Sequence, residues 1–136
     1  MSTQNDSQAS YTPEEIIAKL QAHPKFGSQI KPITNHQSAI ISSGLEPAVV
    51  IAGAGSGKTE TMSNRVLYLV ANGFATPDQI LGLTFTRKAA GELSVRIRKR
   101  LRQLSQLPEF GHITSTSTAV TTYHSYAGKL LSEHAI

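Results

Sequence analysis

A glycine-rich turn at residues 53–57 constrains the fold of this chain more than any other feature, because it separates two segments of opposite character. The segment before it, residues 48–52, is wholly apolar, which is typical of a strand buried on both faces of a parallel sheet. The segment after it, residues 58–72, has apolar side chains at helical spacing and is followed by Gly73, a common helix end. A strand that turns directly into a helix predicts a parallel α/β fold.

The turn and the residues beside it match a phosphate-binding loop of the Walker A type, with Ala52 in place of the usual first glycine. Glycines let successive backbone N–H groups point at phosphate oxygens, and the N-terminus of the next helix favours an anion. Lys58 is expected to reach the β- and γ-phosphates and to act in catalysis, and the Thr59 hydroxyl to ligate Mg²⁺. A plain Gly/Ser-rich connection is the alternative, but the intact Gly-Lys-Thr sequence favours nucleotide binding. The residues predicted to bind the nucleotide here are Ala52, Gly53, Ala54, Gly55, Ser56, Gly57, Lys58 and Thr59.

Two short helices are predicted ahead of this strand. Thr12 can cap the first, and Glu15 stands at the position that completes a capping box. The second is expected to begin at Thr34. Residues 1–10, rich in Ser, Gln and Asn, are predicted to be a disordered tail, which leaves residues 11–136 as one domain segment.

Two further strand–helix units are predicted downstream. Residues 80–85 form a strand that leads into a basic helix at residues 87–104, and residues 118–122 form a strand that leads into a helix from Tyr123. The buried face of the basic helix is expected to carry Leu93, Ile97, Leu101 and Leu104. The alternation of strands and helices predicts a three-layer α/β/α arrangement on a short parallel sheet.

Basic residues are concentrated in the second half of the chain. Residues 1–79 carry five Lys/Arg and six Asp/Glu, whereas residues 80–136 carry eight and three, and the total net charge is +4. This excess is either a solvated basic face or a surface for a polyanion, and charge alone does not decide between them. The chain has no Cys, no apolar run long enough to span a membrane and no signal-peptide pattern at its start. A cytoplasmic protein without a membrane partner is therefore expected.

Four segments resemble, in the right order, the motifs of superfamily 1A DNA helicases of the UvrD, Rep and PcrA type. Residues 52–59 resemble the helicase form of the phosphate loop, and residues 34–40 resemble the Q motif. Residues 80–90 resemble motif Ia, and residues 120–126, Val-Thr-Thr-Tyr-His-Ser-Tyr, resemble motif Ib. The resemblance covers about residues 33–134 and implies a partial RecA-like P-loop domain. In detail the segments are similar to actinobacterial UvrD-like helicases, among them the motor subunits of AdnAB-type helicase–nucleases.

The resemblance implies ATP with Mg²⁺ as the ligand and adds two residues to the nucleotide site. Gln37 is implied to read the adenine edge, since a carboxamide both donates and accepts hydrogen bonds, with a solvent-facing polar residue as the alternative. Glu60 stands where close relatives commonly have an Arg packed against the adenine. A negative charge there implies weaker adenine affinity or base selectivity, unless Glu60 faces solvent.

The resemblance also implies contacts to single-stranded DNA at the carboxyl ends of the second and third strands, where open α/β sheets bind ligands. The implied contact residues are Thr84, Phe85, Thr86, Arg87, Lys88, Thr122, Tyr123 and His124. Phe85 either stacks on a base or lies in the core, and Lys88 either reaches a phosphate or is solvated. His124 either contacts a phosphate or supports its loop. The basic run from Arg96 to Arg102 is expected to be mainly a solvated helix face.

Groups that ATP hydrolysis requires are missing from this pattern. Hydrolysis needs a strand-end acid for Mg²⁺, a group that orients the attacking water and usually an arginine finger. None of the nine acidic residues directly follows an apolar strand downstream of the phosphate loop, so no Walker B motif is found. We expect the N-terminal part of a helicase ATP-binding domain. By itself this part should bind ATP but not hydrolyse it. The expected partners are the remaining helicase domains and, in the AdnAB-type case, a helicase–nuclease subunit.

Three functions therefore stand beside one another. The first is the ATP-binding part of a DNA helicase that moves 3′ to 5′, a polarity that comes from the resemblance alone. The second is a single-strand-binding module that has kept the fold but lost the motor, with DNA affinity unaffected by ATP. The third is a P-loop phosphotransferase, which transfers phosphate to a small acceptor and has no DNA affinity.

Overall fold

The computed structural model describes residues 9–43, 49–51 and 56–134. Two sets of predictions lie outside these residues: the tail at residues 1–8, and the phosphate-loop residues Ala52, Gly53, Ala54 and Gly55. Ala9, at the start of the described part, is partly buried and packs against the hydrophobic core. Contacts with the core thus extend into the segment predicted to be a tail.

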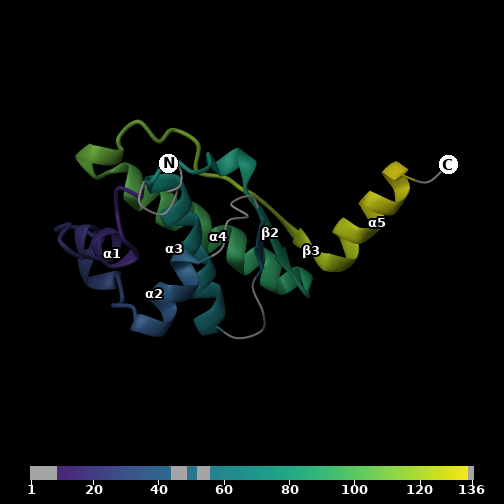
Figure 1. The fold of residues 1–136 in the computed structure, drawn as a ribbon, viewed down its shortest axis with the longest axis horizontal. Coiled ribbons are helices and arrows are strands. Elements are labelled where there is room, and N and C mark those ends of the chain that lie inside the picture. Colours follow the sequence, from purple (N-terminus) through teal and green to yellow (C-terminus); the bar gives the residue numbers. More distant parts are fainter. Residues whose placement is uncertain (1–8, 44–48, 52–55, 135–136) are drawn as a thin grey trace, which may run out of the picture.

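Three parallel strands, β1 (Val49–Ile51), β2 (Leu81–Thr84) and β3 (Ala119–Thr122), form one sheet (Figure 1). Their order in the sheet is β1-β2-β3, so each strand pairs with the next one in the chain. Gly82 of β2 aligns with Val120 of β3. The parallel α/β class predicted from the sequence is confirmed. The second and third predicted strands are longer than β2 and β3, by two residues and one residue.

Capping and periodicity signals place the beginnings of α1, α2 and α4 correctly, whereas α3 already includes two residues before the predicted start at Lys58. The α-helices are α1 (Pro13–Gln21), α2 (Asn35–Ser42), α3 (Ser56–Ala71), α4 (Arg87–Ser105) and α5 (Tyr123–His134). Short 3-10 helices in the connections are η2 (Gly27–Gln29), η3 (Pro77–Gln79) and η4 (Pro108–Phe110). The capping box predicted at the start of α1 is confirmed, because Thr12 and Glu15 each accept a hydrogen bond from the other's backbone N–H. A second box at Thr34 begins α2.

Helices α3 and α4 pack against each other on one face of the sheet, and α1 and α2 pack on α3 (Figure 1). This follows from the strand order, because right-handed connections between strands that lie side by side in chain order carry successive helices to the same face. The described residues therefore form two layers rather than the predicted three. Helix α5 follows β3 and extends away from the body of the protein (Figure 1).

The hydrophobic core lies between the sheet, α4, α3 and the N-terminal helices. Leu93, Ile97, Leu101 and Leu104 are each no more than 1% exposed, which confirms the predicted buried face of α4. Gly82 lets β2 approach α4 closely, since a Cβ at this position would lie 3.3 Å from both Leu93 Cδ2 and Val120 Cγ2. This close approach fixes the first half of α4 against the sheet.

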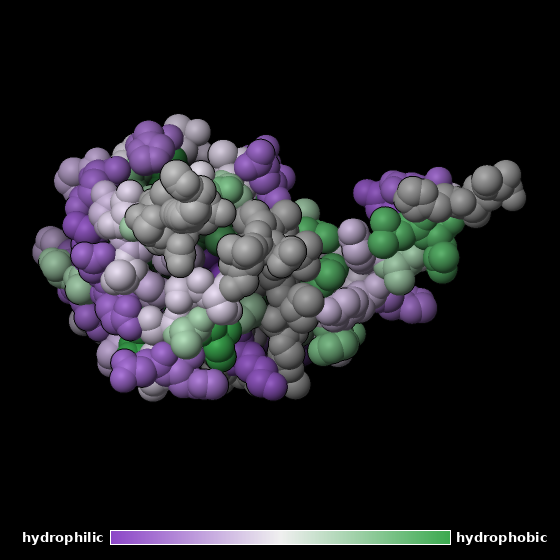
Figure 2. Space-filling model, in the orientation of Figure 1, coloured by the Kyte–Doolittle hydropathy of each residue, from purple (hydrophilic) through white to green (hydrophobic). Residues whose placement is uncertain are grey.

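Helix α5 keeps an apolar surface that the described residues do not cover. Leu131 is 72% exposed and Leu130 is 38% exposed. In Figure 2 the apolar residues of α5 form a green patch that stands apart from the main body. Helix α5 therefore adds little to the core of the described residues.

Replacing Ile97 by alanine is expected to lower the free energy of unfolding by about 2–5 kcal/mol, because it leaves a cavity in a close-packed core. Ile97 is 1% exposed, whereas Val95 on the same helix is 60% exposed. Val95→Ala is therefore the matched control and should change the free energy by less than about 0.5 kcal/mol. Urea unfolding followed by circular dichroism measures both, and equal losses would contradict the orientation of α4.

Candidate functional site

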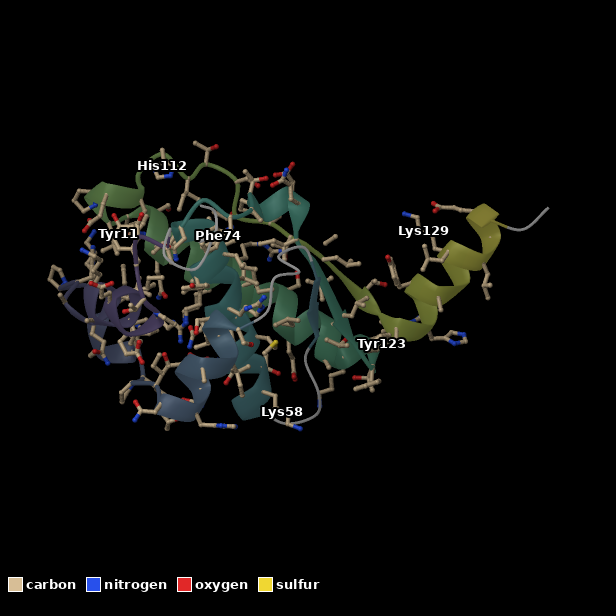
Figure 3. The ribbon with its side chains drawn as sticks, in the orientation of Figure 1. Tyr11, Lys58, Phe74, His112, Tyr123 and Lys129 are labelled. Atoms are coloured by element: carbon tan, nitrogen blue, oxygen red, sulfur yellow. The ribbon has the colours of Figure 1, made fainter. Side chains whose placement is uncertain are left out.

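Three helices begin at the carboxyl edge of the sheet. Helix α4 begins shortly after β2, helix α5 begins directly after β3, and α3 begins beyond β1. Because the strands are parallel, these helix starts lie toward one edge, as Lys58 of α3 and Tyr123 of α5 do in Figure 3. Open α/β sheets bind ligands at this edge, and the free N–H groups of a helix start favour anions.

The described part of the predicted phosphate loop is the first turn of α3. Ser56 and Gly57 begin the helix, so their backbone N–H groups have no partner within it. The side chain of Lys58 is exposed, and this first turn contains no acidic residue. Thr59 is 9% exposed, and its carbonyl accepts a hydrogen bond from Ser63 Oγ at 2.8 Å. The turn thus combines a cation with N–H groups that have no partner within the helix, which suits a phosphate ligand.

Gln37 lies in the first turn of α2 and takes part in its capping box. Its Oε1 accepts a hydrogen bond from the backbone N–H of Thr34 at 2.9 Å, and its own N–H donates to Thr34 Oγ1 at 3.0 Å. The side chain predicted to read adenine is half-buried and helps to begin its own helix. One acceptor site of its carboxamide is thereby occupied by the backbone.

Arg65 ties α2 to α3, a connection that was not predicted from the sequence. Its side chain is buried, and Nη1 donates hydrogen bonds to the carbonyls of Ile41 at 2.7 Å and Ser43 at 2.5 Å. These carbonyls lie at the end of α2, where acceptors lack helical partners and a cation is favourable. The sequence offered one signal for this role, because Arg65 directly precedes the apolar stretch 66–71, where a charged side chain needs a buried partner. Arg65 therefore fixes the helix of Gln37 to the helix that begins at the phosphate loop.

Glu60 joins the beginning of α3 to α4. Its Oε1 accepts a hydrogen bond from Nη1 of Arg96 at 2.5 Å, and its Oε2 accepts one from Nη2 of Arg100 at 3.0 Å. Arg100 also donates from Nη1 to Gln103 Oε1 at 2.9 Å. The side chains of Glu60 and Arg100 are 18% and 8% exposed. Glu60 thus faces α4 rather than open solvent, and the expectation that the basic run is a solvated face is wrong for Arg100.

The Glu60 carboxylate stays ionised in this setting. Burial alone would raise its pKa, but the charges and hydrogen bonds of Arg100 and Arg96 outweigh burial and hold the pKa below the ordinary value of 4.5. The three side chains therefore form a charged cluster at neutral pH, which joins two helices that both begin at the same edge of the sheet.

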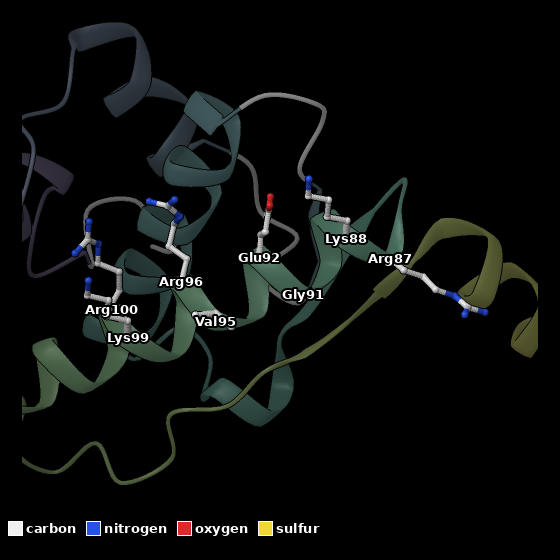
Figure 4. Close-up of a pocket in the computed structure, with 8 residues that line it drawn as sticks. All are labelled: Arg87, Lys88, Gly91, Glu92, Val95, Arg96, Lys99 and Arg100. Atoms are coloured by element: carbon white, nitrogen blue, oxygen red, sulfur yellow. The ribbon is translucent and has the colours of Figure 1, made fainter.

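An open groove of about 830 Å³ runs along α4 beside this cluster (Figure 4). Lys88, Glu92 and Arg96 lie on the same side of α4, whereas Arg87 extends the other way toward α5 (Figure 4). The lining residues are Arg87, Lys88, Gly91, Glu92, Val95, Arg96, Lys99 and Arg100. Most of the lining is basic, so the groove favours anions, although Glu60 already binds two of the arginines.

An aromatic pair marks the edge where β2 and β3 end. The rings of Phe85 and Tyr123 are stacked, with centroids 5.2 Å apart and an interplanar angle of 29°. Phe85 is 66% exposed, which excludes the alternative that it lies in the core. Tyr123 is half-buried, so Phe85 presents the more open ring of the pair. An exposed ring at a ligand-binding edge is suited to contact the flat face of a base.

The threonines beside this pair differ in accessibility. Thr84 is 1% exposed and its hydroxyl donates to the carbonyl of Thr86 at 3.0 Å. Thr122 is 8% exposed and its Oγ1 accepts a hydrogen bond from the N–H of Ser125 at 3.1 Å. Both hydroxyls therefore fix local backbone instead of facing solvent. Among the predicted DNA contacts, the exposed ones are Phe85, Thr86, Arg87, Lys88 and His124.

Comparison with known proteins assigns the chain to a family. Residues 33–136 match the model of the UvrD/REP helicase N-terminal domain, so the chain belongs to this family. It is 43% identical to DNA helicase IV of Escherichia coli over 86 residues, which cover 62% of this chain and 13% of that protein. It is 41% identical to the ATP-dependent DNA helicase UvrD2 of Mycobacterium tuberculosis over 85 residues, which cover 62% of this chain and 11% of that protein.

A third relative, matched over a shorter segment, is also a DNA helicase. The ATP-dependent DNA helicase Rep of Buchnera aphidicola is 47% identical over 58 residues, which cover 43% of this chain and 9% of that protein. The chain therefore spans no more than 13% of the length of these relatives. Within the described residues, no helix is both long enough and apolar enough to cross a membrane.

The Glu60 cluster makes stability depend on pH in a definite direction. The pKa of Glu60 in the folded chain lies below the ordinary 4.5, so its contribution is present above that pH and is lost as the pH falls through the folded value. Glu60→Gln is therefore expected to lower the free energy of unfolding at neutral pH. It should also remove part of the loss that the unchanged chain shows between about pH 5 and pH 3. Denaturant titrations across this range measure both effects.

The control for this prediction is Glu109→Gln. Glu109 pairs with Lys19 at 2.7 Å, but both side chains are more than a third exposed, so this pair should contribute little. Parallel pH profiles for the unchanged chain and Glu60→Gln would show that Glu60 does not form the cluster in solution.

Proposed function

We propose that this chain is the ATP- and single-stranded-DNA-binding part of the motor of an ATP-dependent DNA helicase. The observation that carries the proposal is the shared carboxyl edge of the sheet, where the exposed Lys58 at the start of α3 lies together with exposed Phe85 stacked on half-buried Tyr123. Membership of the UvrD/REP family supports it. In the parent protein the sheet is part of a RecA-like domain, and the remaining helicase domains are the partners of this one.

ATP with Mg²⁺ is the proposed nucleotide. Lys58 and the N–H groups of the first turn of α3 hold the phosphates, Thr59 ligates Mg²⁺, and Gln37 meets the adenine edge. The turn fits such a ligand, because it offers a cation and helix-start N–H groups without an acidic residue. Glu60 is left out of this set, because both of its carboxylate oxygens bind arginines of α4. Bound Mg²⁺–ATP supplies the phosphoryl chemistry that drives a motor.

Single-stranded DNA is the proposed nucleic acid. The Phe85–Tyr123 pair stacks on a base, while Arg87, Lys88 and His124 bind phosphates beside it. Thr86 begins α4 by accepting a hydrogen bond from the N–H of Ala89 at 3.0 Å, so it fixes the start of the helix that carries Arg87 and Lys88 directly after Phe85.

Turnover and movement belong to the parent protein in this proposal. A motor closes a cleft between two domains around ATP, and this chain supplies one wall of such a cleft. The chain alone therefore binds ATP without useful hydrolysis. The 3′-to-5′ polarity, a helicase–nuclease partner subunit and a cytoplasmic location are proposed from the resemblance to UvrD-like helicases.

Lys58→Ala is expected to weaken ATP binding at least about tenfold, because a charge-assisted contact to phosphate is lost. Titration of the chain with a fluorescent ATP analogue and Mg²⁺ measures the change. Lys25→Ala, an exposed lysine in the loop after α1, is the control and should leave the affinity unchanged. Unchanged affinity in Lys58→Ala would mean that phosphates bind elsewhere.

Phe85→Ala is expected to weaken binding of labelled oligo(dT) roughly tenfold, since stacking on an aromatic side chain is worth about 1–3 kcal/mol per base. Phe74→Ala is the control, because Phe74 is an exposed aromatic residue that lies away from Tyr123 (Figure 3). Titrations at several salt concentrations count the phosphates that the chain contacts. The logarithm of the binding constant should fall with the logarithm of the salt concentration by about 0.7 for each neutralised phosphate. Equal losses in the two variants would remove the aromatic pair from the DNA site.

The same titrations separate the competing functions. DNA affinity that ATP does not change would indicate a single-strand-binding module that has lost its motor. Nucleotide binding without any DNA affinity would indicate a phosphotransferase. A change of DNA affinity on adding ATP is the result expected of a helicase motor.

A further inference from the structure

We infer that Glu60 is a positioning residue that locks the phosphate-binding turn of α3 onto α4. The inference rests on the proposed function and deepens it, because the head of α4 carries the proposed DNA contacts. Glu60 follows Lys58 and Thr59 directly in the chain. All three residues belong to the beginning of α3, so any movement of the first turn of this helix must also move the Glu60 carboxylate.

The contacts of Glu60 define one arrangement of the two helices. Each carboxylate oxygen accepts a hydrogen bond from a different guanidinium, Arg96 at 2.5 Å and Arg100 at 3.0 Å. Two bonds from two residues fix both the distance and the rotation of α3 relative to α4. Gln103 holds Arg100 from its other side at 2.9 Å, so one of the two partners is itself oriented.

The stiffness of α4 extends this link to the DNA edge. Helix α4 is continuous over 19 residues, from Arg87 at its head to Ser105. At a rise of about 1.5 Å per residue, Arg96 lies about 14 Å from the head of the helix. Thr86, Arg87 and Lys88 therefore move as one body with the residues that hold Glu60.

Forming the contacts of Glu60 removes other polar groups of the two arginines from water. The Nε–H groups of Arg96 and Arg100 are buried without an acceptor among the residues that the structure describes. An unsatisfied buried donor destabilises the fold, and a buried ion pair is weak evidence for a stabilising role. The arginines keep their terminal nitrogens on Glu60 despite this cost, which favours a role in alignment over one in stability.

Two explanations of the role of Glu60, its charge alone and its alignment of α3 with α4, predict opposite effects of Glu60→Gln on ATP affinity. Removing a negative charge and releasing two arginines near a phosphate site should strengthen ATP binding if only charge matters. Loss of alignment should weaken ATP binding, although Glu60 does not contact the nucleotide. The sign of the change therefore decides between the two.

The experiment titrates the full chain and its variants with a fluorescent ATP analogue and Mg²⁺, with and without oligo(dT). Glu60→Gln is expected to weaken ATP binding about fivefold or more and to reduce the effect of ATP on DNA affinity. Glu92→Gln is the matched control, because Glu92 is an exposed carboxylate in the same groove that forms no ion pair within the described part of the chain. Its ATP affinity should be unchanged or tighter.

A double-mutant cycle tests whether the effect passes through the arginines. Once Arg96 and Arg100 have both been changed to Gln, Glu60→Gln should cause no further loss of ATP affinity. Additive losses would overturn the inference. A loss of binding sites at unchanged affinity would also overturn it, because partial unfolding would then explain the effect.

Two outcomes separate this inference from the proposed function. If the unchanged chain binds neither ATP nor oligo(dT), the proposed function fails and the inference fails with it. If the unchanged chain binds both while Glu60→Gln binds ATP equally or more tightly, the proposed function stands and the inference alone is overturned.

Discussion

Parallel pairing of the three short strands is the constraint on which the rest of the structure depends. Parallel neighbours must be joined by a return crossing, and here α3 and α4 provide it. Every strand then ends at the same edge, and the next helix starts there with N–H groups that its own backbone does not bind. A turn that suits phosphate and an aromatic pair that suits a base lie toward the same edge for this reason, although Lys58 and Tyr123 are far apart in the chain.

Local signals in the sequence predicted most of the elements. The Thr12 and Thr34 capping boxes and the apolar stripe of α4 depend on residues a few positions apart, so they can be recognised without the fold. The layers could not be predicted in this way. Strand order is decided by pairing between distant segments, and the order β1-β2-β3 leaves both connecting helices on one face, where alternation of elements had suggested two.

The candidate site divides along the same line. Lys58 and Thr59 are recognisable because the phosphate loop is a contiguous pattern. The partners of Glu60 and Arg65 lie between 22 and 40 residues away, so their roles could not be predicted from neighbouring residues. Arg100 belongs to a run of basic residues that suggests a solvent-exposed helix face. Its ion-pair partner, Glu60, lies on another helix, so the burial of Arg100 could not be predicted from the run. Gln37 fits two patterns at once, since a helicase motif and a capping box ask for the same residue type at this position.

The order of the strands also bears on how the fold is reached. Each strand pairs with the one made just before it, and each connecting helix packs on the helix made just before it. Contacts between neighbouring segments close small loops, which favours rapid folding. During synthesis the sheet can thus grow by one strand–helix unit at a time as the chain leaves the ribosome. The first turn of α3 can therefore form before β2, the strand that pairs with β1, has been translated.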